Sequence, residues 1–331
     1  MIKTATTSDK KSTTVICPVC KNNTKKVRTL DQKFILKGLQ YYYNEYFDNK
    51  MTKNLNIHDY SIYRCNYCTL EFSLPPITGN NDFYEWVTSH PNYFHSNRWE
   101  WPTIVANLVK QSKKRKIRVL EVGCGSGIFL NMINGLRNTD VIGIDSTPSA
   151  VEECHKKGLM VYLETLESFL SKPKHKNQRF DYVIAFHTLE HIERPKEWVS
   201  IMTRILKPKG TIILSTPYSP LSFETKWYDP LNYPPHHMTR WNQRAYHELA
   251  SQLGLKANIV TSPSSSLIVR TLISLNLSWN SASEPMSVRK TFLQAIVHPI
   301  TVVWEIQRQF KREKVNGRPA GDIALVQINK K

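Results

Sequence analysis

Residues 117–127 read IRVLEVGCGSG, an apolar run that ends in three closely spaced glycines. Such a run is typical of a buried β-strand, and the residues after Gly127 have the apolar spacing of a helix. Glycine at positions 123, 125 and 127 lets the backbone turn sharply and lie close to a ligand. The stretch therefore predicts a strand, a tight turn and a helix, with a binding site at the turn.

Downstream of this turn, short apolar runs alternate with helical segments. Continuous apolar strands separated by helices are typical of a parallel sheet that helices cover on both faces, so the predicted fold class is doubly wound α/β. The expected strands are 117–122, 140–145, 159–163, 180–187, 210–216, 256–261 and the ALVQI segment near the end of the sequence. The expected helices are Pro102–Lys110, 127–136, 148–157, 165–171, 194–206, 243–253 and a helical region over 264–313, broken at Pro285 and Pro299.

An acidic residue lies where a nucleoside would need it. Asp145 ends the second expected strand, 22 residues after Gly123, and a carboxylate there accepts hydrogen bonds from both ribose hydroxyls. The glycines are spaced G-x-G-x-G, unlike the G-x-G-x-x-G of dinucleotide folds, and the Lys-Ser/Thr pair of a triphosphate-binding loop is missing. An ordinary tight turn is the alternative for the glycines alone. Together with Asp145 they favour a ligand that contains a nucleoside.

Four motifs follow one another in a characteristic order. They are EVGCGSG (121–127), GID (143–145), FDYVIAFHTLEHIERPKEW (180–198) and ILKPKGTIILSTPY (205–218). This series resembles class I S-adenosylmethionine-dependent methyltransferases, over residues 115–262 and the last strand. The resemblance implies a Rossmann-like sheet of seven strands with the last one antiparallel, and S-adenosyl-L-methionine as cofactor. Lys209 and Arg194 depart from the family pattern, which has a glycine and an acid there.

The resemblance also implies which residues hold the cofactor. Glu121 and the glycine turn would surround its methionine part, Asp145 would bind the ribose, residues 164–166 would flank the adenine, and Phe186 and His187 would lie under the sulfonium. The expected cofactor-binding residues are Glu121, Gly123, Cys124, Gly125, Gly127, Asp145, Ser146, Thr165, Leu166 and Phe186. The side chains of Cys124 and Cys154 are expected to pack in the core.

Two cysteine pairs precede the α/β region. Cys17-Pro-Val-Cys20 and Cys65-Asn-Tyr-Cys68 form a C-x2-C…C-x2-C set, and four thiolates in a tetrahedron bind Zn²⁺ as a closed, structural site. A redox-active pair is the alternative. The arrangement resembles bacterial methyltransferases for nucleotide-linked deoxysugars and relatives from polysaccharide and natural-product clusters. That resemblance implies an anionic or sugar-linked small-molecule acceptor, methylated on a hydroxyl or a carbon.

Histidines lie where a general base is expected. His236 and His237 belong to the loop after the fifth expected strand, and ligands of open α/β sheets bind beyond the carboxyl ends of the strands. Imidazoles titrate near neutral pH, so either histidine is a candidate base, with a structural hydrogen bond as the alternative. His187 is expected to contact substrate or cofactor. Its neighbours Glu190 and His191 are expected to be structural.

These motifs divide the chain into parts. The expected parts are a disordered tail (1–14), a zinc-binding module (15–78), a helical linker or lid (79–114), a methyltransferase core (115–263 with 317–331) and a helical insertion (264–316). In the insertion, an apolar stripe crosses Pro299 and basic residues follow it. This pattern indicates packing on the core or on a second subunit, or contact with an anionic membrane surface.

Composition bounds the remaining functions. The sequence has 331 residues and a formal net charge of +18, which favours anionic partners such as phosphates, nucleic acid or acidic lipids. An RNA methyltransferase that holds RNA with its zinc module and basic surface is therefore the alternative function. The sequence has no secretory signal and no apolar run long enough for a transmembrane helix, so we expect a cytoplasmic protein.

Overall fold

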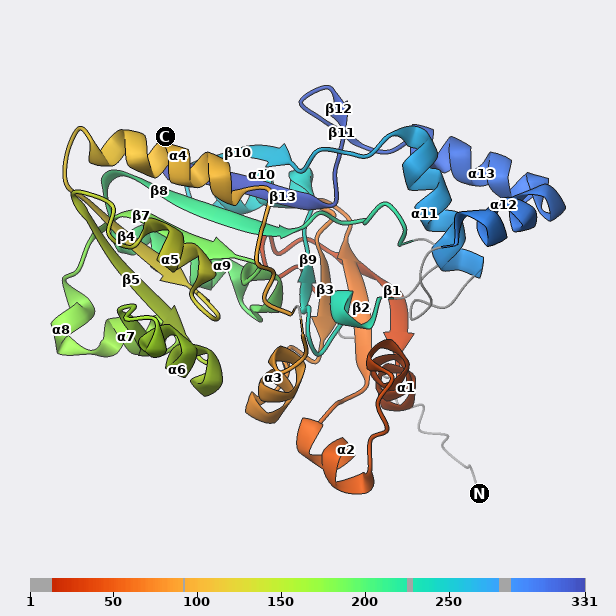
Figure 1. Ribbon diagram of the computed structural model, residues 1–331, viewed down its shortest axis with the longest axis horizontal. Coiled ribbons are helices and arrows are strands. Elements are labelled where there is room, and N and C mark those ends of the chain that lie inside the picture. The colour runs from red at the N-terminus through yellow and green to blue at the C-terminus, as the bar shows by residue number, and fades with distance from the viewer. Residues whose placement is uncertain (1–13, 92, 225–228, 280–286, 331) are drawn as a thin grey trace, which may run out of the picture.

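The computed structural model describes residues 14–91, 93–224, 229–279 and 287–330 (Figure 1). Residues 1–13 of the expected tail and the expected helix break at Pro285 lie outside the described residues.

A seven-stranded sheet forms the centre of the molecule, as predicted (Figure 1). The strands are β4 (Ile117–Val122), β5 (Thr139–Asp145), β6 (Val161–Leu163), β7 (Phe180–Phe186), β8 (Leu206–Pro217), β10 (Leu255–Thr261) and β13 (Ile323–Lys330). Their order across the sheet is β10-β13-β8-β7-β4-β5-β6. β4 to β8 are parallel, whereas β13 is antiparallel to both β8 and β10. The expected antiparallel last strand is therefore confirmed.

Helices cover both faces of this sheet, which explains why its central strands are apolar throughout. On one face α4 (Trp101–Ser112) and α5 (Ile128–Ile133) pack on β4, β7 and β8. On the other face lie α7 (Leu166–Ser171), α9 (Pro195–Arg204) and α10 (Gln243–Gln252). The short helices α6 (Pro148–Lys156) and α8 (Pro173–Lys176) and the 3-10 turns η1 (Leu189–His191) and η2 (Pro230–Asn232) complete this region.

The N-terminal module has its own sheet and core. Its elements are β1 (Thr24–Leu30), α1 (Gln32–Tyr43), α2 (Asn49–Leu55), β2 (Tyr60–Cys65), β3 (Glu71–Leu74) and α3 (Asn81–Thr88). The sheet order is β1-β2-β3-β9, and β9 (Thr239–Arg240) comes from the loop after β8. The module is therefore joined to the methyltransferase-like core by a shared sheet, and this sheet anchors the histidine loop.

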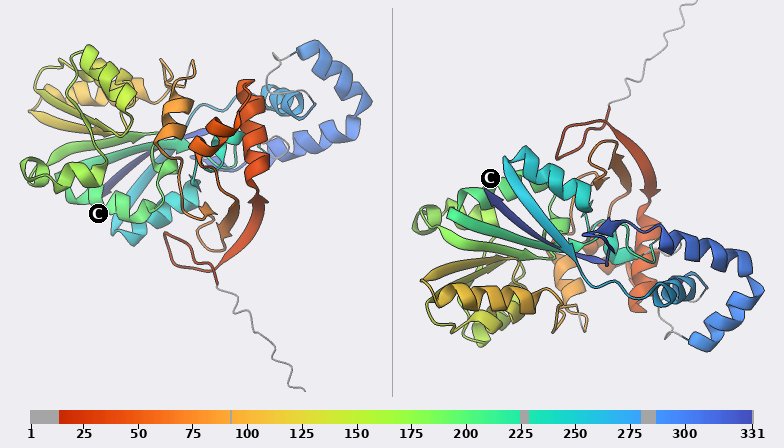
Figure 2. Two further views of the ribbon diagram at one scale, coloured as in Figure 1. Left: turned by 90° about the horizontal axis from the view of Figure 1, so that it is seen from below. Right: turned by 90° about the horizontal axis from the view of Figure 1, so that it is seen from above.

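A helical lobe projects from the end of the molecule remote from β5 and β6 (Figures 1 and 2). It consists of α11 (Leu267–Trp279), α12 (Val288–Val297) and α13 (Pro299–Phe310), followed by the small hairpin of β11 (Lys314–Val315) and β12 (Arg318–Pro319). The break expected at Pro299 is confirmed, because proline opens α13 and cannot continue α12. Among the described residues, no helix combines the length and the apolarity that crossing a bilayer requires.

Candidate active site

The glycine turn connects β4 to α5 at the carboxyl edge of the sheet. Gly123, Gly125 and Gly127 all have positive φ angles, of 71°, 52° and 73°, a backbone conformation that costs other residues about 1–2 kcal/mol. Asp145 lies beside the turn. Its Oδ2 accepts a hydrogen bond from the Gly125 N–H (2.8 Å), and its Oδ1 accepts one from the Thr147 N–H (2.9 Å). The Thr147 side chain and the Ser146 backbone also hydrogen-bond to this carboxylate.

The turn is covered by the segment between α3 and α4. A Cβ added at Gly125 would lie 2.5 Å from the ring of Phe94, and one at Gly123 would lie 2.4 Å from the Thr188 hydroxyl. Both positions therefore exclude side chains by contact as well as by backbone conformation. Burial raises the pKa of Asp145, and hydrogen bonds from the backbone of Thr147 and Gly125 oppose that rise.

Two buried carboxylates, those of Glu100 and Glu190, flank His187 next to the turn. His187 Nε2 lies 3.4 Å from Oε1 of Glu100, and its Nδ1 lies 3.4 Å from Oε1 of Glu190. Both carboxylate oxygens of Glu190, one of Glu100, one of Glu121 and Nε2 of His187 are buried without a hydrogen bond to a described residue. Buried carboxylates without partners are costly, so this cluster is suited to a ligand that carries positive charge or hydrogen-bond donors.

Burial and neighbouring charges set the ionisation of this cluster. Burial raises the pKa of Glu121 well above its ordinary value, whereas for Glu100 the nearby imidazole of His187 overcomes the effect of burial and lowers the pKa. Arg98 faces the same acids. Burial lowers its pKa, and the charges of Glu100, Glu190 and Glu121 act in the opposite direction.

The histidine loop reaches this cluster from the other side. In His236, Nδ1 lies 2.8 Å from the Leu231 carbonyl and Nε2 lies 2.8 Å from the Tyr93 hydroxyl. A carbonyl only accepts, so Nδ1 donates to Leu231 and Nε2 accepts from Tyr93. Both nitrogens of His236 are therefore used. Although His236 lies close enough to His191 and His237 to share a metal ion, these hydrogen bonds leave it no free ligand atom.

His237 is oriented by a chain of polar contacts. Asn232 donates through Nδ2 to Glu224 Oε1 (2.8 Å), which turns its Oδ1 toward His237 Nδ1 at 3.1 Å. Nδ1 therefore carries the proton, and Nε2 has a free lone pair 4.0 Å from Glu190 Oε1. Arg240 pairs with Glu224, and its Nη1 lies 3.3 Å from Glu71 Oε2 in the N-terminal module.

The two histidines of this loop are buried, and burial lowers the pKa of each well below its ordinary value of 6.5. Both are therefore neutral imidazoles at neutral pH. Only His237 has a nitrogen that is both unprotonated and free of a hydrogen bond to a described residue.

The four cysteines of the N-terminal module converge at one point. All four Sγ atoms lie within 4.8 Å of one another. The Sγ–Sγ distances are 3.6 Å for Cys17 and Cys68 and 3.5 Å for Cys20 and Cys65. A tetrahedron with Zn–S bonds of about 2.3 Å requires sulfur–sulfur distances of about 3.8 Å. The backbone N–H groups of Tyr67 and Cys68 also point at Cys65 Sγ (3.3 and 3.4 Å), as expected around a thiolate.

Comparison with known proteins identifies the core. A family model described as "Methyltransferase domain" matches residues 93–259, half of the chain. The chain belongs to this methyltransferase family. Its seven-stranded sheet has the class I arrangement of the S-adenosylmethionine-dependent members.

Similar proteins cover only part of the chain. A mitochondrial ubiquinone biosynthesis O-methyltransferase of Dictyostelium discoideum is 27% identical over 114 residues (30% of this chain and 35% of that protein). A ubiquinone biosynthesis O-methyltransferase of Roseobacter denitrificans is 28% identical over 137 residues (40% and 52%). This methyltransferase thus spans about a third to a half of the curated relatives it matches. A SAM-dependent methyltransferase from Archaeoglobus fulgidus aligns with TM-score 0.44 and 19% identity, over 70% of this chain and 94% of that structure.

The site of this methyltransferase fits S-adenosylmethionine, because that molecule carries positive charge and hydrogen-bond donors. Its ammonium group can donate to the buried oxygens of Glu121 and Glu190 that have no hydrogen bond to a described residue. Phe186 was also predicted to contact the cofactor. Its ring packs on Phe129 and Trp101 in the core.

The remaining predicted cofactor residues divide by burial. The side chains of Cys124 and Leu166 are buried in the core. Ser146 is exposed beside the turn. Thr165 caps α7, because its hydroxyl accepts a hydrogen bond from the Ser168 N–H.

Sequence reasoning missed the residues that close the methyltransferase site. Tyr93, Phe94, Arg98 and Glu100 come from one segment, residues 93–100, which was predicted only as part of a helical linker or lid over 79–114, with none of these residues singled out. The signal available was local: an arginine and an acid sit among three aromatic residues just before an apolar helix. Glu190 was interpreted as structural, yet it lies between His187 and His237.

Proposed function

We propose that this chain transfers a methyl group from S-adenosylmethionine to a hydroxyl of a small-molecule acceptor, with His237 as the general base. The observation that carries the proposal is the orientation of His237 by Asn232 and Glu224, which leaves its Nε2 free at the edge of the acid cluster. Oxygen as the acceptor atom is supported by the similar proteins, which are named O-methyltransferases.

The cofactor is held by the glycine turn and the strand ends around it. In the proposed arrangement Asp145 binds the ribose hydroxyls, Glu121 and the backbone of residues 123–127 face the methionine part, and residues 146 and 164–166 flank the adenine. When bound, S-adenosylmethionine supplies an activated methyl group on a sulfonium. The chain holds donor and acceptor in line, which removes much of the entropic barrier.

His237 would accept the proton of the acceptor hydroxyl, which makes the acceptor oxygen a better nucleophile. Its neutral form is the one present at neutral pH, because burial lowers its pKa. Glu190, 4.0 Å from Nε2, stabilises the imidazolium that results. Asn232 and Glu224 act as positioning residues, because they determine which nitrogen carries the proton. His187 sits between Glu100 and Glu190 and keeps its predicted role of contacting substrate or cofactor.

A structural zinc ion in the Cys17, Cys20, Cys65 and Cys68 site is part of the same proposal. The four sulfurs are within 4.8 Å of one another, and four cysteines leave no coordination position for substrate. The ion would hold β2 and β3 in place. Because β3 pairs with β9, it would stabilise the base of the histidine loop. A sugar or nucleotide-sugar acceptor, and RNA as the alternative, remain predictions of the sequence.

The test compares two neighbouring histidines. His237→Gln is expected to lower turnover by about 10²–10⁴-fold, the usual contribution of a general base, with unchanged affinity for S-adenosylhomocysteine. His236→Gln is the matched control, since both its nitrogens are already bonded, and a smaller loss is expected. Turnover is measured with a panel of hydroxylated acceptors that includes catechols and nucleotide sugars. Full activity of His237→Gln on any acceptor that the wild type methylates would refute the assignment of the base.

A further inference from the structure

The helical lobe has an inverted distribution of side chains. Helices in water bury apolar residues and expose polar ones, but in α11–α13 many of the buried positions are polar: Arg270, Thr271, Asn276, Thr291, Glu305 and Gln309. The exposed residues include large apolar side chains, among them Phe292 (62% exposed), Ile296 (64%), Val297 (71%), Ile300 (85%) and Phe310 (76%). This surface is suited to an apolar environment rather than to water.

Hydrogen bonds inside the lobe hold the helices in this orientation. Asn276 donates to Thr291 (2.8 Å) between α11 and α12, and Arg270 Nε donates to Gln309 (3.1 Å) between α11 and α13. Gln309 in turn donates to the Ser222 carbonyl (2.7 Å) in the loop after β8. Turning the apolar side chains inward would break these bonds and bury unpartnered polar groups. The apolar face is therefore directed outward by the polar core.

The charged residues of the α12–α13 hairpin lie at its base, away from its tip at residues 297–300. Residues 291–304, which include this tip, contain no Asp, Glu, Lys or Arg. The base carries the cations Arg289, Lys290, Arg308, Lys311 and Lys314. The two acids of this region are engaged: Glu305 binds Arg308 (3.0 Å), and Glu313 accepts from the Tyr218 hydroxyl (2.7 Å). An apolar tip above a cationic base is complementary to acyl chains beneath anionic headgroups.

We infer that the α12–α13 hairpin inserts into one leaflet of an anionic membrane and so attaches the enzyme to the membrane surface. The helices have 10 and 12 residues, about 15 and 18 Å, which matches half of a hydrocarbon core of about 30 Å. The hairpin therefore lies in one leaflet with its tip, Val297 and Ile300, deepest.

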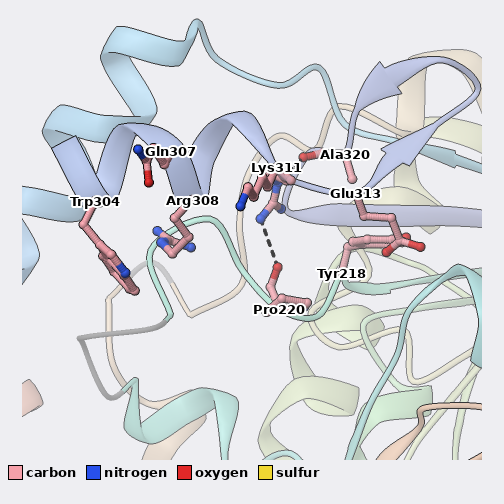
Figure 3. A pocket seen from close by; sticks show the side chains of 9 residues that line it. Tyr218, Pro220, Trp304, Gln307, Arg308, Lys311, Glu313 and Ala320 are labelled. Atoms are coloured by element: carbon pink, nitrogen blue, oxygen red, sulfur yellow. Dashed lines mark hydrogen bonds between the residues drawn. The ribbon is translucent and has the colours of Figure 1, made fainter. Parts of the chain in front are cut away.

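A cavity at the base of the hairpin lies where the headgroups would be (Figure 3). It measures about 400 Å³ and is lined by Trp304 of α13, by Lys311 just after this helix, and by Tyr218 and Pro220 from the loop after β8. Tryptophan favours the membrane–water interface, and Lys311 is the exposed cation on this wall. Because Tyr218 directly follows β8, the cavity lies near the carboxyl edge of the sheet.

The test is flotation of the full-length protein with vesicles of phosphatidylcholine, with and without about one third phosphatidylglycerol. We expect the wild type to float with the anionic vesicles. Ile296→Asn/Ile300→Asn should lower the bound fraction at least about tenfold, because two deeply inserted apolar side chains are lost. Lys311→Glu/Lys314→Glu should weaken binding to the anionic vesicles. Met160→Asn, at a position 60% exposed beside β6, is the control and should float as the wild type does.

The inference is wrong if the wild type does not float, or if the Ile296→Asn/Ile300→Asn variant floats as well as the wild type. It is also wrong if neither protein floats and the wild type is a dimer that this variant converts to a monomer. The last result would assign the surface to a second copy of the chain. The tip residues are exposed, so the melting temperature should not fall. If the tip variant nevertheless fails to fold, equal flotation of the Lys311→Glu/Lys314→Glu variant on anionic vesicles refutes the inference by itself.

Discussion

Replacing Asp145 by Asn tests the cofactor pocket most directly. The carboxylate holds the Gly125 and Thr147 N–H groups, one on each oxygen, and in the proposed arrangement it also accepts hydrogen bonds from the ribose hydroxyls. Asparagine has a single acceptor oxygen, so it loses a charge-assisted bond to the ribose, and its NH₂ group faces a backbone N–H donor. A hydrogen bond to a charged group contributes about 1.5–3 kcal/mol. The altered ribose contact therefore predicts a loss of about 1.5–3 kcal/mol, or about 10- to 100-fold in affinity.

The assay is calorimetric titration with S-adenosylhomocysteine. Asp140→Asn is the matched control, because Asp140 lies on the same strand, is half exposed and pairs with Lys116 at 3.0 Å on the surface. Its affinity should equal that of the wild type. If Asp145→Asn binds within about twofold of the wild type while its unfolding transition stays cooperative, the ribose assignment is wrong, and with it the proposed position of the cofactor.

Three further predictions concern the metal, the buried histidines and the cover of the site. Elemental analysis should find about one zinc per chain, with Cys65→Ser losing it and Cys124→Ser keeping it; equal zinc in both variants would contradict the site. The melting temperature should fall as the pH drops below 6.5, because burial lowers the pKa of His191 and of the two loop histidines in the folded state, so the unfolded chain binds more protons. His191→Gln should make the stability less dependent on pH by up to about 1.4 kcal/mol per pH unit, and an unchanged slope would show that this histidine is not the cause. Phe94→Ala should speed release of S-adenosylhomocysteine by roughly tenfold, because the ring that covers the glycine turn is lost; stopped-flow rates equal to those of the wild type would exclude that role.

The sheet was predictable because local signals suffice for it. The apolar run that ends at Val122 and the glycines after it indicate strand and turn by themselves, and the resemblance to a known series of motifs implied the seven strands and the antiparallel last strand. Asp145 could be placed for the same reason, since the end of one parallel strand lies beside the start of the next turn. The inverted burial of α12 and α13 could not be predicted, because an apolar stripe indicates a face but not what that face meets.

The sequence alone determined the class I sheet, the glycine turn with Asp145, and the four cysteines paired for a metal, since each depends on residues that are near in sequence or on a motif with fixed spacing. Only the tertiary structure decided that the Tyr93 hydroxyl hydrogen-bonds to Nε2 of His236, and that Asn232 bonds to Nδ1 of His237 and leaves its Nε2 free. It also decided that β9 joins the histidine loop to the N-terminal module. Tyr93 and His236 are 143 residues apart and β3 and β9 pair residues up to 169 apart, whereas Asn232 and His237 are five apart. Tautomers and burial depend on which groups meet in space, and a single sequence does not encode that locally.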